Sequence, residues 1–140
     1  MDMKLSAFIP EEYITSQAGR MDVYKKISLI TCPEDEADIY DEICDRYGTP
    51  PRQVERLLEV SVIRALGEQL GFTKVESTAD SLIIYTGRPD LAVWSEIFQS
   101  HRGMRVAPTG DRIITRLTGE PSRLAKEILV EYTNLKNDSE

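Results

Sequence analysis

The chain has 140 residues, with 24 acidic side chains against 17 Lys and Arg, a formal net charge of −7 and a hydrophobic share of 41%. This length suits one domain with one core, and the acidic balance disfavours nucleic-acid binding by the surface as a whole. The apolar runs are too short to cross a bilayer and no signal peptide is recognisable, so we expect a single cytoplasmic domain over residues 1–140 with no membrane segment.

The start of the chain predicts an extended segment followed by a helix. Residues 4–10 alternate weakly up to a proline, which is typical of a short edge strand or of an extended linker. We therefore interpret residues 1–10 as a segment leading in from an upstream domain. A helix is predicted over residues 19–30, where three apolar side chains share one face: Met21, Tyr24 and Ile27.

A capping-box pattern predicts where a second helix begins. The Thr31 hydroxyl is expected to accept a backbone N–H near Glu34, whose side chain reaches back. Gly48 is expected to end this helix in a left-handed conformation. The predicted apolar stripe consists of Ala37, Tyr40, Ile43, Cys44 and Tyr47. The opposite face is acidic and carries Asp35, Asp38, Asp41, Glu42 and Asp45. Such a face is more often solvated surface than a site.

The third predicted helix has the most regular pattern in the chain. It is expected to follow Pro50 and Pro51, since proline suits a first helical turn, and to end at Gly71. Apolar residues recur along it at the helical spacing: Val54, Leu57, Leu58, Val62, Ala65, Leu66 and Leu70. We expect this helix to be the spine of the core.

In the second half of the chain the spacing of apolar residues is no longer helical throughout, and this change predicts a small sheet. Two pairs of strands, each joined by a turn, are expected over residues 73–76 with 81–86 and 105–107 with 112–117. Helices are expected over residues 89–99, with Leu91, Trp94, Ile97 and Phe98 inward, and over 121–135, with Leu124, Ile128, Tyr132 and Leu135 inward. Residues 136–140 should fray. The predicted fold class is α+β: a three-helix half followed by a small, mainly antiparallel sheet with two further helices.

Few residues could carry chemistry. His101 is the only histidine, and the spacing of Cys32 and Cys44 fits neither a redox pair nor a zinc site. Cys44 and His101 could in principle form a nucleophilic pair. However, Cys44 falls at a core position of its helix, and His101 is predicted to be an exposed residue at a helix end. No phosphate-binding loop is present, so we expect no cofactor, no metal, no nucleotide binding and no enzymatic activity in this chain.

Arginines supply most of the positive charge in the second half. They are Arg102, Arg105, Arg112, Arg116 and Arg123. They could contact nucleic acid, but arginines scattered between strands more often pair within their own chain. A nucleic-acid-contacting module is therefore kept as the main alternative to a protein-binding domain, and a small enzyme as a more distant one.

Three stretches stand out together: residues 9–14 (IPEEYI), 20–27 (RMDVYKKI) and 42–51 (EICDRYGTPP). In this order and spacing they resemble the C-terminal (TRCF) domain of bacterial transcription-repair coupling factors, the Mfd family, whose pattern is IPxxYI, RxxxYKRI and ExxDR[FY]GxxP. The similarity is specific through about Phe72, and beyond that residue it rests on the order of elements. Tyr47 stands where Phe is commoner in the family.

This resemblance implies a regulatory role. It implies a parent protein with a damage-repair recruitment module, an RNA-polymerase-binding module and an ATP-driven DNA translocase, acting in transcription-coupled nucleotide-excision repair. In the family, the C-terminal domain packs on the UvrB-like N-terminal module, covers the surface that recruits UvrA and keeps the resting protein inhibited. The expected partner of this chain is thus the UvrB-like N-terminal module of its own parent protein. UvrA, RNA polymerase and DNA are expected partners of the parent.

The resemblance also implies roles for individual residues. The acidic first and fourth positions of ExxDR[FY]G are here Glu42 and Asp45, which are expected to meet arginines of the UvrB-like module. As i, i+3 neighbours on one helix face they can point at one partner, and the sequence shows no evident partner for them within the chain. The end of this helix and the turn after it are expected to be anchored by Arg46, Tyr47, Gly48 and Pro51.

Overall fold

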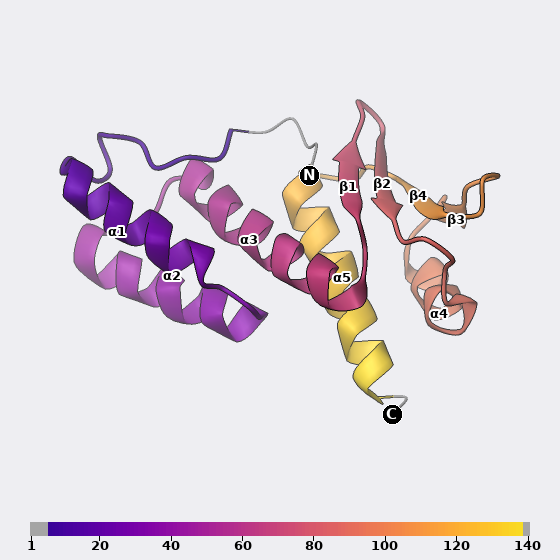
Figure 1. Cartoon of the computed structure of the whole chain (residues 1–140). Coiled ribbons are helices and arrows are strands. Elements are labelled where there is room, and N and C mark those ends of the chain that lie inside the picture. The colour runs from indigo at the N-terminus through magenta and orange to yellow at the C-terminus, as the bar shows by residue number, and fades with distance from the viewer. Residues whose placement is uncertain (1–5, 139–140) are drawn as a thin grey trace. The chain divides into compact units, whose positions relative to one another are not determined.

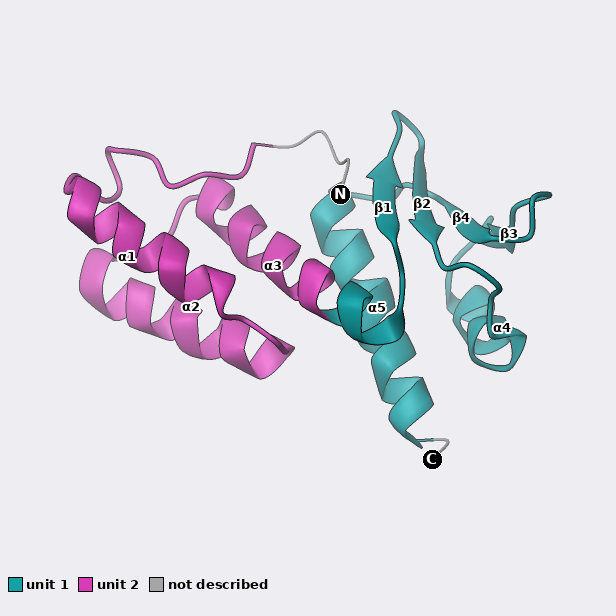
Figure 2. Ribbon diagram, viewed as in Figure 1, with its two compact units in different colours: residues 1–4, 66–140 teal, residues 5–65 magenta. Residues whose placement is uncertain are grey.

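The computed structural model describes residues 6–138, which contain five helices and four strands (Figure 1). Contacts between Cα atoms divide the chain into two compact units (Figure 2). The described part of the first, the helical unit, is residues 6–65, and that of the second, the mixed unit, is residues 66–138. Among residues 6–138, none of the helices combines the length with the apolar character that a membrane span requires.

Helix α1 (Gln17–Ser28) begins where the Ser16 hydroxyl accepts a hydrogen bond from the Gly19 amide at 3.2 Å. The predicted inward face of this helix is wrong in part. Val23 and Ile27 are buried, whereas Met21 is 64% exposed and Tyr24 is 40% exposed. Ile27 belongs to two apolar rows on α1, one with Met21 and Tyr24 and one with Val23. The helical unit buries the second row, in which Val23 and Ile27 have the i, i+4 spacing.

Helix α2 (Pro33–Tyr47) begins near the predicted place, but by a different cap. Its N-cap residue is Cys32, so the third helical position is occupied by Asp35 and not by Glu34. The Asp35 carboxylate accepts from both the Thr31 amide at 3.0 Å and the Thr31 hydroxyl at 2.8 Å, and these bonds lower the pKa of Asp35. The Thr31 hydroxyl therefore donates here, contrary to the prediction.

The faces of α2 follow the predicted pattern with two exceptions. Ile43 is buried and Tyr40, Cys44 and Tyr47 are half-buried, but Ala37 is exposed and Glu36 is buried. The acidic face remains, with Asp38, Asp41, Glu42 and Asp45 all exposed and only Asp35 half-buried. The helix ends at Gly48, whose φ of 88° requires glycine, although its ψ of −176° differs from the left-handed helical value.

Helix α3 (Arg52–Leu70) forms as predicted, with its apolar stripe facing the core. Its buried apolar residues are Val54, Leu58, Val62, Ile63 and Leu66, while Leu57, Ala65 and Leu70 are half-buried. The helix ends as predicted at Gly71, with φ 78°. The Gly71 amide donates to the Glu68 carbonyl and the Phe72 amide donates to the Gly67 carbonyl at 2.8 Å, which is the Schellman arrangement.

The mixed unit is built on an antiparallel sheet in the order β1-β2-β4-β3. Its strands are β1 (Lys74–Ser77), β2 (Ser81–Tyr85), β3 (Arg105–Val106) and β4 (Arg112–Arg116). In the central pair, Leu82 lies opposite Thr115 and Ile84 opposite Ile113, and all four are buried. Alternate residues of β2 and β4 therefore form the inner face. The α+β fold class is confirmed.

Two helices complete the mixed unit: α4 (Leu91–Ser100) and α5 (Pro121–Asp138). Trp94 in α4 is fully buried, and its ring centroid lies 5.0 Å from that of Tyr132 and 6.1 Å from that of Phe72. Leu91 was expected inside but is 59% exposed, and Leu135 is only half-buried. Trp94 and Tyr132 thus give the two helices a direct ring contact.

The two ends of the chain are described only in part. Residues 6–10 form no strand, which leaves the extended linker of the two alternatives, and Ile9 among them is only 4% exposed, so this segment is packed into the helical unit. Residues 1–5 of the predicted leading segment lie outside the described residues. At the other end, α5 continues through residues 136–138, where fraying was expected, and residues 139–140 lie outside the description.

Candidate functional site

The predicted contact residues lie on the exposed face of α2. Glu42 and Asp45 are both exposed, one turn apart. Glu42, however, has a partner within the chain: its Oε1 lies 2.8 Å from Lys26 Nζ of α1. Lys26 also lies 3.3 Å from the carboxylate of Asp22. The expectation that neither carboxylate has an intramolecular partner is therefore wrong for Glu42, because a sequence pattern on one helix does not reveal a lysine on its neighbour.

Asp45 differs from Glu42 in this respect. Within residues 6–138 its carboxylate has no hydrogen bond or ion pair, and Asp38 and Asp41 on the same helix add exposed negative charge. Lys26 offsets only one of these charges. The face consequently keeps an excess of carboxylates, with Asp45 free to meet a cation and Glu42 in a solvent-exposed ion pair, a kind that contributes little to stability.

A polar and aromatic scaffold supports the end of α2. The Tyr13 hydroxyl donates to the Gly48 carbonyl at 2.6 Å, and its ring meets that of Tyr47 edge-on with centroids 6.0 Å apart. The Arg46 guanidinium lies 5.5 Å from the centroid of the Tyr47 ring. Burial of the phenol, followed by the nearby Cys44, raises the pKa of Tyr13 to about 12. Arg46, Tyr47 and Gly48 thus take part in one connection to the segment that precedes α1.

The same segment is also held by α1. Arg20 donates from Nη1 to the carbonyls of Ile14 at 2.8 Å and Thr15 at 3.1 Å. Tyr24 accepts a hydrogen bond from the Ile9 amide at 2.9 Å through its hydroxyl oxygen. The stretches 9–14, 20–27 and 42–51, which the sequence singled out separately, are therefore joined through Arg20, Tyr24 and Tyr13. The central role of Tyr13 was missed, although its stretch was noted.

Pro51 prepares the start of α3. Its carbonyl accepts from the amides of Val54 at 3.0 Å and Glu55 at 3.2 Å, so two donors of the first helical turn are satisfied. The preceding residue, Pro50, is buried. The turn from α2 into α3 is thereby built from backbone bonds and a buried proline.

The cysteines, the histidine and the acidic residues were the candidates for a metal site or a nucleophilic pair. No group of three or more His, Cys, Asp and Glu among residues 6–138 is arranged to hold a metal ion. Cys44 lies in the helical unit and His101 in the mixed unit. The prediction that His101 is exposed is wrong. Its side chain is only 12% exposed, and Nε2 lies 3.2 Å from the Glu131 carboxylate of α5. It links the end of α4 to α5, a contact that the helix pattern alone does not predict.

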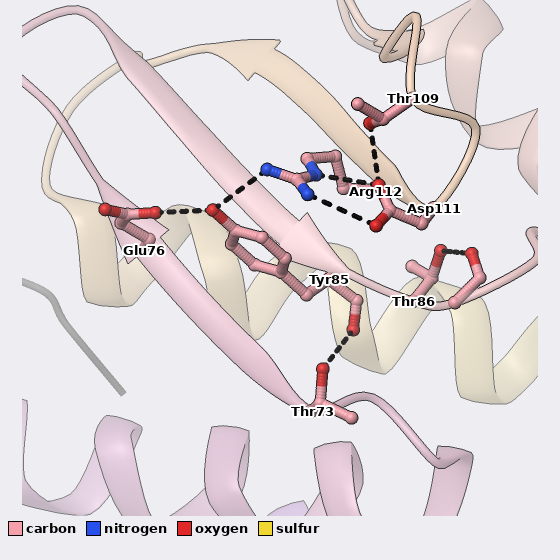
Figure 3. A network of polar contacts seen from close by, with 8 residues as sticks. Thr73, Glu76, Tyr85, Thr86, Thr109, Asp111 and Arg112 are labelled. Carbon is pink, nitrogen blue, oxygen red and sulfur yellow. Dashed lines mark hydrogen bonds and ion pairs between the residues drawn. The ribbon is translucent and has the colours of Figure 1, made fainter.

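The arginines of the mixed unit divide into two kinds. Arg112 contacts Asp111 at 2.8 Å and 3.2 Å and lies 4.4 Å from the centroid of the Tyr85 ring, whose hydroxyl donates to Glu76 (Figure 3). Bonds from Arg112, then from Thr109, lower the pKa of Asp111 to about 2. Intramolecular pairing is confirmed for this arginine. The same prediction is wrong for three exposed arginines: Arg102, Arg105 and Arg116. None of the three side chains has a hydrogen bond or ion pair within the described chain.

Comparison with known proteins gives a consistent result. Residues 3–92 match the family model of the TRCF domain. The chain is 36% identical over 76 residues to the transcription-repair-coupling factor of Staphylococcus haemolyticus and 29% identical over 82 residues to that of Bacillus subtilis. These matches cover 54% and 59% of the chain but only 6% and 7% of the relatives. The chain thus spans a small fraction of their length.

One solved structure extends the comparison to the fold. The crystal structure of the C-terminal domain of a transcription-repair coupling factor superposes with a TM-score of 0.82, covering 99% of this chain and 94% of that one. At 17% sequence identity this likeness concerns the fold alone. It includes the mixed unit, for which the sequence offered only the order of elements.

Proposed function

Since the chain belongs to the TRCF domain family, the C-terminal domain of transcription-repair coupling factors, we propose that it is a non-catalytic regulatory domain. In this proposal it packs on the UvrB-like N-terminal module of its parent, masks the surface that recruits UvrA and restrains an ATP-driven DNA translocase. The parent displaces stalled RNA polymerase during transcription-coupled nucleotide-excision repair. The name of the curated relatives, transcription-repair-coupling factor, supports this proposal.

The observation that carries the proposal is the exposed carboxylate of Asp45, one turn from Glu42 on a helix whose end is firmly held. Tyr13 and Gly48 anchor the end of α2 through a 2.6 Å hydrogen bond, so the two carboxylates have a rigid base. A rigid acidic pair favours arginines, which form planar, paired bonds with carboxylates. Opposite charge on the partner would align the two surfaces.

The ion pair between Lys26 and Glu42 is compatible with this role. Both side chains are partly exposed, at 35% and 51%, and exposed pairs contribute little to stability. An arginine of the partner can therefore displace Lys26 from Glu42 at small cost. Lys26 would then compete with the partner for Glu42, while Asp45 needs no such exchange.

The test is charge reversal in the full-length parent, with Glu42→Lys and Asp45→Lys combined. Loss of attraction should open the closed state, raising UvrA affinity and ATPase rate together, because one equilibrium governs both. Circular dichroism of the isolated chain is the folding control, and Glu96→Lys with Glu127→Lys, two exposed positions of the mixed unit, is the charge-matched control. Unchanged affinity and rate in a folded double variant would remove both residues from the mechanism.

A second candidate function rests on Arg102, Arg105 and Arg116. These exposed side chains are unpaired within residues 6–138, so they are available to phosphate groups. Binding of a 20-base-pair DNA duplex to the isolated chain, measured by fluorescence anisotropy at several salt concentrations, tests this function. Affinity that falls steeply with salt and is lost when all three become Gln would support it. The acidic net charge of −7 favours the first proposal.

A further inference from the structure

A groove of about 670 Å³ lies on the helical unit, between the segment before α1 and the turn into α3. Its apolar walls are formed by Phe8, Pro10, Tyr13 and Pro51, and its rim carries Glu11 and Glu12. Phe8 is 44% exposed, so part of its ring is accessible at the groove. The groove does not include Glu42 or Asp45, and the proposed regulatory contact does not use it.

The walls of this groove are fixed by bonds within the helical unit. The amides of Tyr13 and Ile14 donate to the Pro10 carbonyl at 3.1 Å and 3.2 Å, which closes a turn that includes Glu11 and Glu12. Ile9 and Ile14, on either side of this turn, are only 4% and 2% exposed. The Tyr13 hydroxyl is tied to Gly48. A ligand would therefore meet a preformed surface and pay little to order it.

The charge of the groove selects its ligand. The two charged residues that line it, Glu11 and Glu12, are both exposed, and neither has a hydrogen bond or ion pair among the described residues. The other residues at the groove are apolar or neutral. An anionic ligand, such as nucleic acid or an acidic peptide, would be repelled, whereas a cationic group would find two free carboxylates.

We infer that this groove binds an extended polypeptide segment in which an arginine follows a proline or leucine. Aromatic and proline side chains form the kind of surface on which extended, proline-containing segments dock. A guanidinium stacks on aromatic rings and also bonds to carboxylates, so Tyr13 and the glutamates at the rim suit arginine in particular. The apolar residue of the ligand then covers Phe8, and the arginine reaches Glu11 or Glu12.

The experiment titrates the isotopically labelled 140-residue chain with acetyl-Leu-Pro-Arg-Arg-amide and follows its backbone amides by NMR. Saturable shifts are expected around residues 8–13 and 49–53. The charge-reversed peptide acetyl-Leu-Pro-Glu-Glu-amide should bind at least about tenfold more weakly, the size expected for two lost exposed ion pairs and two new repulsions. Equal shifts with both peptides, or none with the arginine peptide up to the solubility limit, would overturn the inference.

Two variants separate the parts of the groove. Glu11→Gln with Glu12→Gln should weaken binding of the arginine peptide about fivefold while keeping shape and hydrogen-bonding size. Phe8→Ala should weaken both peptides equally, since it removes the apolar contact and not the charge. Asp38→Asn with Asp41→Asn, two exposed positions on α2, removes the same charge as the glutamine variant, is the matched control and should bind as the wild type does. If it alone lost binding, the ligand would belong to the face of α2 and the groove would be excluded.

Discussion

The hydroxyl of Tyr13 donates a hydrogen bond to the carbonyl of Gly48 across 35 positions of the chain, at 2.6 Å. Gly48 has a φ of 88° and ends α2, so this bond ties the segment before α1 to the last turn of the acidic helix. The relationship explains why an extended, irregular segment belongs to the helical unit. It also makes Tyr13 the residue through which that connection can be tested.

Tyr13→Phe should lower the free energy of unfolding by about 1 kcal/mol, because it removes one hydrogen bond and keeps the ring. The effect should depend on pH. The pKa of Tyr13 is raised from 10.0 to about 12, so the folded state favours the neutral phenol. Its contribution is therefore complete below pH 10 and is lost as pH rises from 10 toward 12.

Urea unfolding of wild type and Tyr13→Phe at pH 8, 10 and 11 measures this contribution as a difference between the two proteins. The difference should be complete at pH 8, begin to shrink at pH 10 and be smaller still at pH 11. Other tyrosines cancel because both proteins carry them. A difference that does not change across this range would mean that the phenol titrates in the folded state as it does in the unfolded chain.

Core truncation tests the assignment of the spine helix. Leu58→Ala or Leu66→Ala should each cost about 2–5 kcal/mol, since both side chains are only 2% exposed in α3. Leu91→Ala, at a 59% exposed position, should change stability by less than about 0.5 kcal/mol. Chemical denaturation gives all three values. Similar costs at the buried and the exposed positions would contradict the burial pattern.

Lys26→Ala should strengthen the regulatory contact while changing the stability of the chain little. Its ion pair with Glu42 is exposed, and exposed pairs contribute little to stability, yet removing Lys26 frees a carboxylate and deletes a competing positive charge. Lys25 is its natural control, because this neighbour on α1 has no side-chain hydrogen bond or ion pair within residues 6–138. Calorimetric titration of each variant with the UvrB-like module should show a few-fold tighter binding for Lys26→Ala only.

The same titration can fail in an informative way. Equal tightening by Lys25→Ala and Lys26→Ala would indicate a general effect of net charge. Weaker binding of Lys26→Ala would indicate that Lys26 itself contacts the partner.

Asp111→Asn concerns the turn between β3 and β4. Bonds from Arg112 and Thr109 lower the pKa of Asp111 from 3.8 to about 2, so the folded state favours the ionised form. The stabilising contribution is then present above about pH 4 and disappears as pH falls toward 2. Unfolding of wild type and variant at pH 7, 4, 3 and 2 should show a difference that is constant at the two higher values and declines below. A difference that grows on acidification would contradict the cause assigned here.

Local patterns in the sequence predicted the elements well but not the contacts between them. The i, i+3, i+4 spacing of α3 and the glycine at position 71 were sufficient for that helix, because its stripe is wide and its stop is specific. The turn around residues 108–111 likewise identified β3 and β4. In α1, by contrast, two apolar rows compete, and only the packing of its neighbours decides that Val23 is buried and Met21 is not.

The candidate site shows the same division. Spacing on α2 correctly predicted that Glu42 and Asp45 are exposed, since it depends on one helix alone. The partner of Glu42 is Lys26, sixteen residues earlier on another helix, and that of His101 is Glu131, thirty residues later. Such pairs depend on how helices are placed against each other. A motif describes residues in sequence, and the bonds from Tyr13 and Arg20 that join the motifs become visible only in the fold.

Trp94 is the only tryptophan of the chain, and it is completely enclosed by the rings of Phe72, Phe98 and Tyr132 and by its other neighbours in the mixed unit. Its fluorescence therefore reports on residues 66–138, while the helical unit contributes to circular dichroism without an indole of its own. Two optical signals recorded on one sample thus distinguish the two halves without any label. Coincident transitions would show that the two units unfold cooperatively. An ellipticity change that precedes the fluorescence change would show that the helical unit can unfold first.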